Sequence, residues 1–181
     1  MNQYAASFGM VNTRFENATG LPAKGHASTA RDMANLAKHI DNDHKEYYAL
    51  YKEKEFTYNN ISQQNRNRLL FWDARVDGLK TGHTEEAGFC LVASATEGDM
   101  RLISVVMGAN SDRARARESQ KLLIYGFNYY ESHKLFEAQE TLQTHRVWLG
   151  QKDDLSLGIK DSAYITIPKG QKEIFRPSVI E

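Results

Sequence analysis

Several features that would assign a chain to a familiar class are scarce or missing in these 181 residues. The single cysteine, Cys90, cannot form an internal disulfide or a multi-cysteine metal or redox motif. Its apolar surroundings, residues 89–92, predict a buried and inert thiol. The six histidines never recur at His-x-x-x-His spacing, so we expect neither a metal site nor a cofactor.

Net charge and long apolar runs are missing as well. The chain carries 23 Lys and Arg against 23 Asp and Glu, without the basic excess typical of nucleic-acid binders, so we expect no nucleic-acid partner. No apolar run is long enough to cross a bilayer. The polar N-terminus also lacks the apolar core of a signal peptide, which taken alone would indicate the cytoplasm.

The most informative stretch that is present covers residues 76–84 and contains the tripeptide Lys80-Thr81-Gly82. Apolar alternation and turn residues predict three strands around it, at 76–81, 88–95 and 101–107. Glu97-Gly98-Asp99 supplies the turn between the last two strands. A Lys-Thr-Gly on a strand beside a hairpin is the expected setting for one wall of a serine acyl-transfer site.

The residue types of this tripeptide suit a substrate that ends in a carboxylate. Lys80 can supply a fixed cation, and the hydroxyl of Thr81 can donate to the same carboxylate. Gly82 has no side chain, so a substrate backbone can lie against the strand. An edge strand offers unpaired backbone groups to an added peptide strand, and one backbone N–H can help to hold an oxyanion.

Helices are predicted before and after these strands in the sequence. Thr29 with Asp32 forms a capping pair that opens a helix, and an apolar stripe follows at Met33, Leu36, Ala37 and Ile40. A second helix is predicted from about 112 to 131. Its buried side is predicted at Leu122, Leu123, Phe127 and either Tyr125 or Gly126. We also expect a short helix at 44–51, a strand at 55–58 and a loop at 59–67.

Four arginines near these elements are candidates for anion binding. Arg66 lies in the loop shortly before the Lys80 strand, either as a solvated side chain or as a substrate contact. Arg113, Arg115 and Arg117 fall in the first turns of the later helix, where positive charge opposes the helix dipole. Arginines and free N–H groups at a helix start would instead suit an anion. The alternative is three solvated arginines at small cost.

These motifs, set in VDGLKTGHT, LVASAT and RLISVVMG, resemble those of the low-molecular-mass penicillin-binding proteins. More narrowly, the chain resembles the D-alanyl-D-alanine carboxypeptidases of the peptidase S11 family related to penicillin-binding protein 5. The resemblance covers nearly the whole chain and weakens toward its end. Further matching stretches lie at 1–5, 28–34, 51–57 and 65–67.

The resemblance implies a reaction and a site. A serine attacks the terminal D-Ala-D-Ala amide of a peptidoglycan stem peptide, D-alanine leaves, and water hydrolyses the acyl-enzyme; penicillins acylate the same serine. Lys80, Thr81 and Gly82 would form the catalytic wall, and His83 is typical of this subgroup. Arg115 would lie near the terminal carboxylate, and we interpret Arg113 and Arg117 as solvated. The implied partners are such stem peptides and β-lactam antibiotics.

Two motifs of the family are missing from this sequence. No serine is followed three positions later by lysine, and no Ser-x-Asn occurs. Without a nucleophile the acyl-enzyme cannot form, so we expect the chain by itself to be inactive. Since both motifs would precede the stretch that resembles residues 1–5, we expect a fragment whose N-terminal portion, including an export signal, is missing.

The resemblance also sets the expected fold and location. We expect an α/β (α+β) fold: the C-terminal part of a transpeptidase-like domain, with an antiparallel sheet flanked by helices, at residues 1–134. Short strands, including one at 147–149, predict the start of a β-rich domain at residues 135–181. The intact protein would be periplasmic and peripheral on the inner membrane, through a C-terminal anchor that this chain lacks.

Two alternatives stay open at this level. One is a nucleophile-free module that still binds D-Ala-D-Ala ends through Lys80, Thr81, His83 and Arg115. Ligand binding without turnover would distinguish it from an enzyme fragment. The other is a β-lactamase that shares the Lys-Thr-Gly wall, but His83 and the β-rich C-terminal part make it the weaker alternative.

Overall fold

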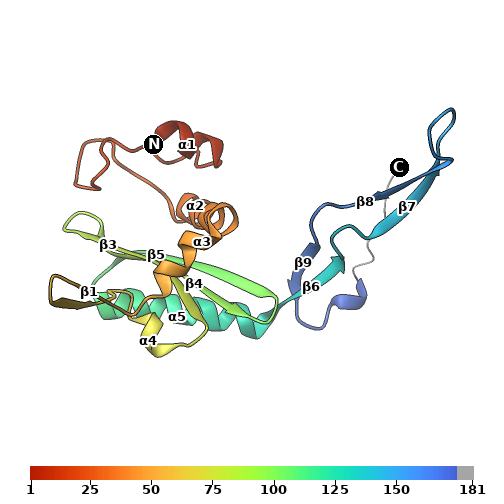
Figure 1. The fold of residues 1–181 in the computed structure, drawn as a ribbon. Coiled ribbons are helices and arrows are strands. Elements are labelled where there is room, and N and C mark those ends of the chain that lie inside the picture. The colour runs from red at the N-terminus through yellow and green to blue at the C-terminus, as the bar shows by residue number, and fades with distance from the viewer. Residues whose placement is uncertain (175–181) are drawn as a thin grey trace. The chain divides into compact units, whose positions relative to one another are not determined.

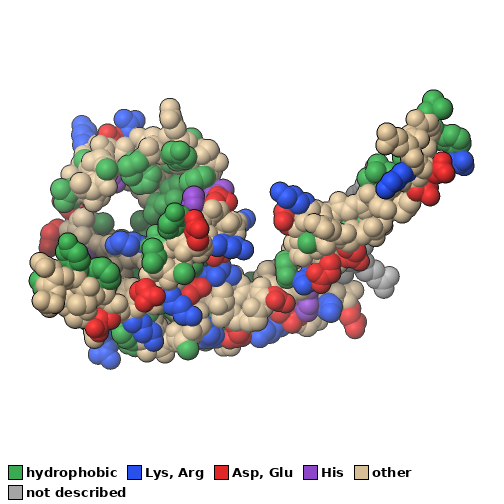
Figure 2. Space-filling view, in the orientation of Figure 1, with side chains coloured by type: hydrophobic (Ala, Val, Ile, Leu, Met, Phe, Trp, Pro, Cys, Tyr) green, Lys and Arg blue, Asp and Glu red, His purple; other side chains and the backbone are tan. Residues whose placement is uncertain are grey.

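The computed structural model describes residues 1–174, which fall into two compact units divided between Gly126 and Phe127 (Figure 1). Residues 175–181, the end of the expected second domain, lie outside the described part. Positive and negative side chains are interspersed over the surface in view, in keeping with the zero net charge (Figure 2). No helix among the described residues is long and apolar enough to cross a membrane.

An antiparallel sheet of order β3-β4-β5 is the centre of the first unit. Its strands are β3 (Val76–Thr84), β4 (Gly88–Glu97) and β5 (Met100–Ala109), so the three predicted strands are confirmed, each slightly longer than expected. Helix α2 (Ala30–Asp43) lies on one face and helix α5 (Asp112–Tyr129) on the other (Figure 1). The expected fold, an antiparallel sheet flanked by helices, is therefore confirmed.

Helix α2 begins where the sequence predicted. The hydroxyl of Thr29 accepts a hydrogen bond from the backbone N–H of Asp32, which satisfies one of the free donors at the helix start. The buried carboxylate of Asp32 does not return this bond to Thr29. It accepts instead from the backbone N–H of Asn12 and the hydroxyl of Thr13, and so ties the preceding irregular segment to the helix.

Strand alternation divides the core between the two faces of the sheet. Ala37 of α2 packs with Tyr48 and with Leu79 of β3, and Ile103 of β5 packs against this cluster. Leu102, the neighbour of Ile103, points to the other face, where its side chain approaches Gly126 of α5 so closely that no Cβ would fit there. The sheet is therefore covered by packed side chains on both faces.

Helix α5 buries a stripe that differs in part from the predicted one. Leu123 and Phe127 are buried as predicted, and of the two alternatives Tyr125 and Gly126 it is Gly126 that is buried. Leu122 is 49% exposed, so its assignment to the buried side was wrong. The buried positions on this helix include Ala116, Ser119, Leu123 and Phe127, which follow one another at steps of three and four residues. That spacing follows one face of an α-helix, and Leu122 lies outside this face.

Short elements complete the first unit. They are α1 (Asn2–Ser7), α3 (Lys45–Tyr48) with the 3-10 turn η1 (Ala49–Lys52), the strands β1 (Glu55–Tyr58) and β2 (Ile61–Gln64), and α4 (Leu69–Trp72). The predicted loop at 59–67 was wrong in part, since β2 lies within it. Asn59 and Asn60 have φ values of 53° and 61°, which close a two-residue hairpin turn between β1 and β2.

The second unit is built from paired strands. They are β6 (Tyr130–Phe136) with β9 (Ala163–Pro168), and β7 (Thr141–Arg146) with β8 (Asp154–Gly158), before the 3-10 turn η2 (Lys172–Ile174). The strand predicted at 147–149 was wrong, because these residues connect β7 to β8 and Leu149 has a φ of 62°. The predicted boundary after residue 134 differs from the observed division, since β6 begins at Tyr130 and pairs with β9.

Candidate active site

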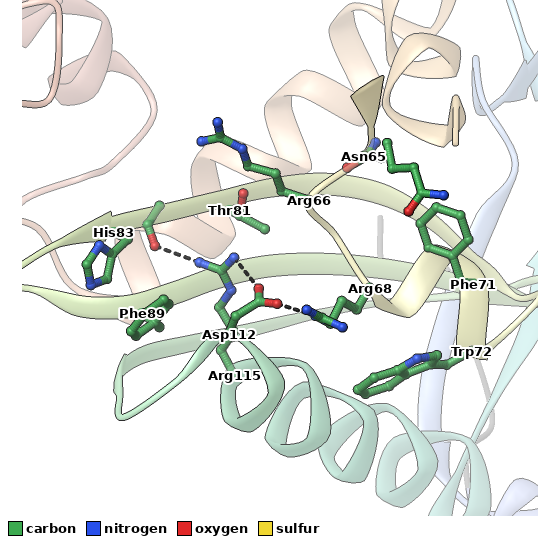
Figure 3. Close-up of a pocket in the computed structure, with 12 residues that line it drawn as sticks. Asn65, Arg66, Arg68, Phe71, Trp72, Thr81, His83, Phe89, Asp112 and Arg115 are labelled. Carbon is green, nitrogen blue, oxygen red and sulfur yellow. Dashed lines mark hydrogen bonds and ion pairs between the residues drawn. The ribbon is translucent and has the colours of Figure 1, made fainter. Parts of the chain in front are cut away.

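A cavity of about 660 Å³ lies beside the end of β3 (Figure 3). The end of β3, the start of β4, the first turn of α5 and the segment around α4 enclose it. The residues that line it are Gln64, Asn65, Arg66, Arg68, Phe71, Trp72, Thr81, Gly82, His83, Phe89, Asp112 and Arg115. Five of the six site residues predicted from sequence therefore meet at one cavity, and Lys80 is the exception.

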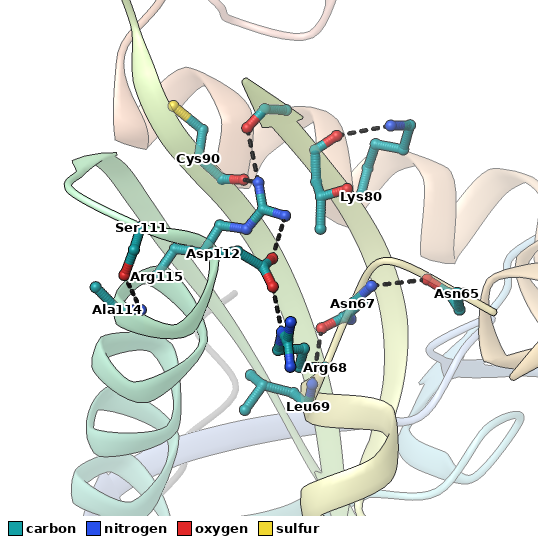
Figure 4. A network of polar contacts seen from close by, with 12 residues as sticks. Asn65, Asn67, Arg68, Leu69, Lys80, Cys90, Ser111, Asp112, Ala114 and Arg115 are labelled. Carbon is teal, nitrogen blue, oxygen red and sulfur yellow. Dashed lines mark hydrogen bonds and ion pairs between the residues drawn. The ribbon is translucent and has the colours of Figure 1, made fainter. Parts of the chain in front are cut away.

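Arg115 is buried, with only 6% of its side chain exposed, and holds the two strands at the cavity floor. Its Nη1 donates to the backbone carbonyls of Gly82 on β3, at 2.9 Å, and Cys90 on β4, at 3.2 Å. Its Nη2 donates to Asp112 at 2.6 Å (Figure 4). The guanidinium also lies over the ring of Phe89. Much of its hydrogen-bonding capacity is thus used within the protein.

Asp112 lies between two arginines. One carboxylate oxygen accepts from Arg115, and the other accepts from Arg68, which comes from the opposite wall of the cavity (Figures 3 and 4). Burial by itself would raise the pKa of Asp112, but the hydrogen bonds from Arg68 and Arg115 outweigh it and hold the pKa below its ordinary value. Asp112 therefore stays ionised at neutral pH.

Arg66 and Thr81 are two donors that the cavity leaves available. Within residues 1–174, neither the guanidinium of Arg66 nor the hydroxyl of Thr81 makes a hydrogen bond or ion pair with another side chain. Arg66 lies near Thr81 and apart from the cluster around Asp112 (Figure 3). A free guanidinium beside a free hydroxyl is a suitable pair of donors for a carboxylate.

Lys80 lies on the other side of β3, as strand alternation requires. Its Nζ donates to the backbone carbonyl of Thr81 at 2.6 Å (Figure 4). It lines a second, mainly apolar cavity of about 330 Å³ between the sheet and α2, to which Cys90 also contributes. Cys90 is half-buried, not buried as predicted, because it lies close to the start of β4. The role of Lys80 as the cation for a substrate carboxylate stays a prediction.

His83 and Phe89 form the aromatic end of the cavity. The two residues are cross-strand partners in the β3–β4 pair, and their ring centroids lie 3.9 Å apart at an angle of 35°. Arg113 and Arg117 are exposed and take no part in the cavity lining, and Arg117 pairs with Glu118. The placement of these two helix arginines agrees with the interpretation of them as solvated side chains.

A buried polar network fixes the start of β3, just before the tripeptide. The side-chain amide of Asn67 donates to the carbonyl of Gly78 at 2.8 Å, and both residues are buried. Arg101 of β5 donates to both carboxylate oxygens of Asp77, at 2.8 and 2.9 Å. The irregularity in the β3–β4 register lies at this point, between Val76 and Gly78. These contacts set the position from which Lys80, Thr81 and Gly82 extend.

Sequence reasoning missed several of these residues. The site residues predicted from sequence do not include Asn67, Arg68 and Asp112, although Asn67 lies in the matching stretch 65–67 and Asp112 was expected at a helix start. Their contacts join segments that are distant in sequence, and no local pattern reports such pairs. No three His, Cys, Asp or Glu side chains among the described residues gather as metal ligands.

Comparison with known proteins then relates this geometry to a family. Residues 1–111 match the family model of the D-alanyl-D-alanine carboxypeptidases, peptidase S11. The chain belongs to this family. Residues 130–180 match the model of the C-terminal domain of penicillin-binding protein 5. This match begins at Tyr130, the first residue of β6. The resemblance found in the sequence is thereby confirmed, and the second unit corresponds to a recognised β-rich domain.

Individual carboxypeptidases agree with the family match. The chain is 52% identical to D-alanyl-D-alanine carboxypeptidase DacC of Escherichia coli over 180 residues, which cover 98% of this chain and 45% of DacC. It is 49% identical to DacA of Haemophilus influenzae over 175 residues, 95% of this chain and 44% of DacA. The chain thus spans less than half the length of these curated relatives.

Solved structures show the same relationship. Penicillin-binding protein 5 from Haemophilus influenzae superposes with a TM-score of 0.84 at 47% identity, over 95% of this chain and 51% of that one. Penicillin-binding protein 6B from Escherichia coli gives a TM-score of 0.75 at 39% identity, over 95% of this chain and 49% of that one. The fold of this chain is therefore that of the corresponding half of these proteins.

Proposed function

We propose that this chain is part of a serine-type D-Ala-D-Ala carboxypeptidase, and that it provides the wall of the active site that holds the C-terminal end of the substrate. The observation that carries the proposal is the cavity beside β3, in which the guanidinium of Arg66 and the hydroxyl of Thr81 face open space. In the intact enzyme the substrate would be a peptidoglycan stem peptide, and penicillins would acylate the same serine.

The geometry gives each residue a part in holding the substrate. The terminal carboxylate would accept hydrogen bonds from Arg66 and Thr81, and Lys80 would add positive charge from the adjoining cavity. Among the described residues β3 pairs only with β4, so its other edge is available to an extended peptide. Gly82 leaves room for the peptide backbone, and a β3 N–H would hold the oxyanion. His83 would bound the pocket for the terminal residue.

We infer that this sequence does not encode the nucleophile, because no Ser-x-x-Lys occurs in it. The acyl-enzyme requires a serine oxygen that attacks the amide carbon and a base that takes its proton. We therefore infer that the chain alone neither releases D-alanine nor reacts with penicillins. The test is intact-mass spectrometry of the purified chain before and after incubation with a penicillin. We expect a single unmodified species, and a covalent adduct on this chain would overturn the inference.

A second candidate, a binding module without catalysis, is favoured by the same open donors. The cavity and its free Arg66 are formed by this chain alone, so binding does not need the missing motifs. Isothermal titration with an acetylated tripeptide ending in D-Ala-D-Ala would measure such binding. Binding without release of D-alanine would support the module, whereas release of D-alanine by the chain would contradict it.

For the intact protein we propose a periplasmic location on the surface of the inner membrane. The family resemblance and the peptidoglycan substrate support this proposal, since that substrate lies outside the cytoplasm. Fractionation of cells that express the complete protein would test it. Recovery in the cytoplasmic fraction would contradict it.

A further inference from the structure

Four charged side chains share the cavity beside β3, and they are not equivalent. Arg68 and Arg115 both donate to one carboxylate, that of Asp112, from opposite sides. Arg66 makes no such contact with any described residue. The cavity therefore contains one free guanidinium and two that are already paired. This difference between paired and free guanidiniums determines which ligand charge the cavity favours.

We propose that Asp112 is a specificity-determining residue: an internal counter-ion that reserves the cavity for ligands ending in a single carboxylate and disfavours dianionic groups. The proposal rests on the proposed function, because it concerns the same carboxylate site. It deepens that function by assigning the charge class of the ligand to a residue outside the Lys80-Thr81-Gly82 tripeptide. Asp112 acts through Arg68 and Arg115, and it need not touch the ligand.

The electrostatic reason is the balance of charge at the cavity wall. With Asp112 ionised, Arg68 and Arg115 together carry one uncompensated positive charge, and Arg66 adds a second. Without Asp112 the three guanidiniums would carry three. Attraction between charges a few ångströms apart is strong in such half-buried sites, and a dianion gains about twice as much from an added positive charge as a monoanion. Asp112 thus lowers the affinity for dianions more than the affinity for ligands with a single carboxylate.

The structure also holds Asp112 in this role. It is the first residue of α5, where a negative charge is favourable, so its ionised form is stabilised by the helix as well as by the two arginines. Arg115 in turn donates to the carbonyls of Gly82 and Cys90, so its guanidinium is engaged within the protein before a ligand arrives. Arg66 and Thr81 are thus among the donors that stay available.

The experiment compares two probes on the labelled full chain at pH 8. One probe is an acetylated tripeptide ending in D-Ala-D-Ala, with a single carboxylate; the other is methyl phosphate, whose second ionisation is complete because its pKa is about 6. Dissociation constants are measured by NMR titration for wild type, Asp112→Asn and Asp99→Asn. Asp99 lies exposed in the turn between β4 and β5, so Asp99→Asn removes the same charge away from the cavity.

We expect Asp112→Asn to tighten binding of methyl phosphate about tenfold and that of the peptide only about threefold, as the charge argument requires. Asp99→Asn should leave both constants within about twofold of wild type. The double variant Asp112→Asn with Arg68→Gln removes one charge of each sign, so its selectivity should return toward wild type. An unchanged ratio of the two affinities in Asp112→Asn, or an equal change in Asp99→Asn, would overturn the proposal.

Two further outcomes keep this proposal separate from the proposed function. Failure of the wild-type chain to bind the peptide would count against the proposed function, whereas the gain in methyl phosphate binding would still decide the role of Asp112. If Asp112→Asn loses the native amide spectrum, and so does not fold, the Arg68→Gln variant alone tests the proposal. It leaves Asp112 to neutralise Arg115 fully, so binding of both probes should weaken, and unchanged binding would overturn the proposal.

Discussion

Arg115→Met should destabilise the first unit far more than its position in an arginine-rich helix turn would indicate. The substitution keeps a long apolar stem but removes the donors to the carbonyls of Gly82 and Cys90 and to Asp112. Net contributions of hydrogen bonds from charged groups are about 1.5–3 kcal/mol each. Gly82 is exposed and Asp112 retains Arg68, so those two contacts count for less. We expect a loss of about 3 kcal/mol in the free energy of unfolding.

The assay is urea unfolding followed by the fluorescence of Trp72, which lines the cavity in the first unit. The measurement is made in a Trp148→Phe background, because Trp148 belongs to the second unit. With a urea dependence of about 2 kcal/mol/M, the midpoint should fall by about 1.5 M. Arg113→Met is the matched control, since Arg113 is exposed on the same helix turn, and it should cost less than about 0.5 kcal/mol.

The result that would refute this reasoning is a loss for Arg115→Met no greater than that for Arg113→Met. A second variant, Arg115→Lys, separates charge from geometry. A lysine ammonium cannot reproduce the planar arrangement of donors that reaches both carbonyls and Asp112, so it should recover less than half of the loss. Full recovery by lysine would mean that charge alone accounts for the effect.

Three further outcomes are expected. Asn67→Leu leaves the buried carbonyl of Gly78 without its donor and should cost about 1–3 kcal/mol in urea unfolding; no loss would show that the bond is dispensable. The hydrogen bond from Arg75 lowers the pKa of Asp73 below its ordinary value. The stabilisation that the ionised Asp73 gives the fold is therefore present above about pH 4 and is lost as the pH falls further. Asp73→Asn should therefore lower the melting temperature more at pH 7 than at low pH, where the carboxyl becomes protonated, and an equal difference at both would contradict the shift. In the complete protein, Lys80→Ala should reduce kcat/KM and penicillin acylation about 10²–10³-fold, and near-normal acylation would remove Lys80 from the mechanism.

The parts of the fold that the sequence predicted are those with local signals. The capping pair at Thr29 and Asp32 and the turn at Gly98 each lie within a few residues, and both are found in the structure. The hairpin of β1 and β2 escaped prediction because the Asn- and Gln-rich stretch that encodes its turn and second strand is also typical of loops. Exposed apolar positions on α5, such as Leu122, were misassigned because hydrophobicity alone does not fix the buried face.

The site could be predicted only in outline. Thr81, Gly82 and His83 are neighbours in one strand, so the motif located them together. The pairing of Arg68 with Asp112 joins residues 44 positions apart and depends on how α4 and α5 pack around β3. Sequence reasoning could name Arg115 as an anion-binding candidate, but not that its guanidinium would be used by backbone carbonyls and a carboxylate.

The most direct test of the central claim is an NMR titration of the isotopically labelled chain with an acetylated tripeptide ending in D-Ala-D-Ala. We expect saturable shifts at the amides of Thr81, Gly82 and His83, and weaker binding when Arg66→Gln removes the free guanidinium. The same peptide ending in L-Ala-L-Ala should bind less tightly. Shifts elsewhere only, or equal binding by the Arg66→Gln variant, would contradict the assignment of this wall as the substrate site.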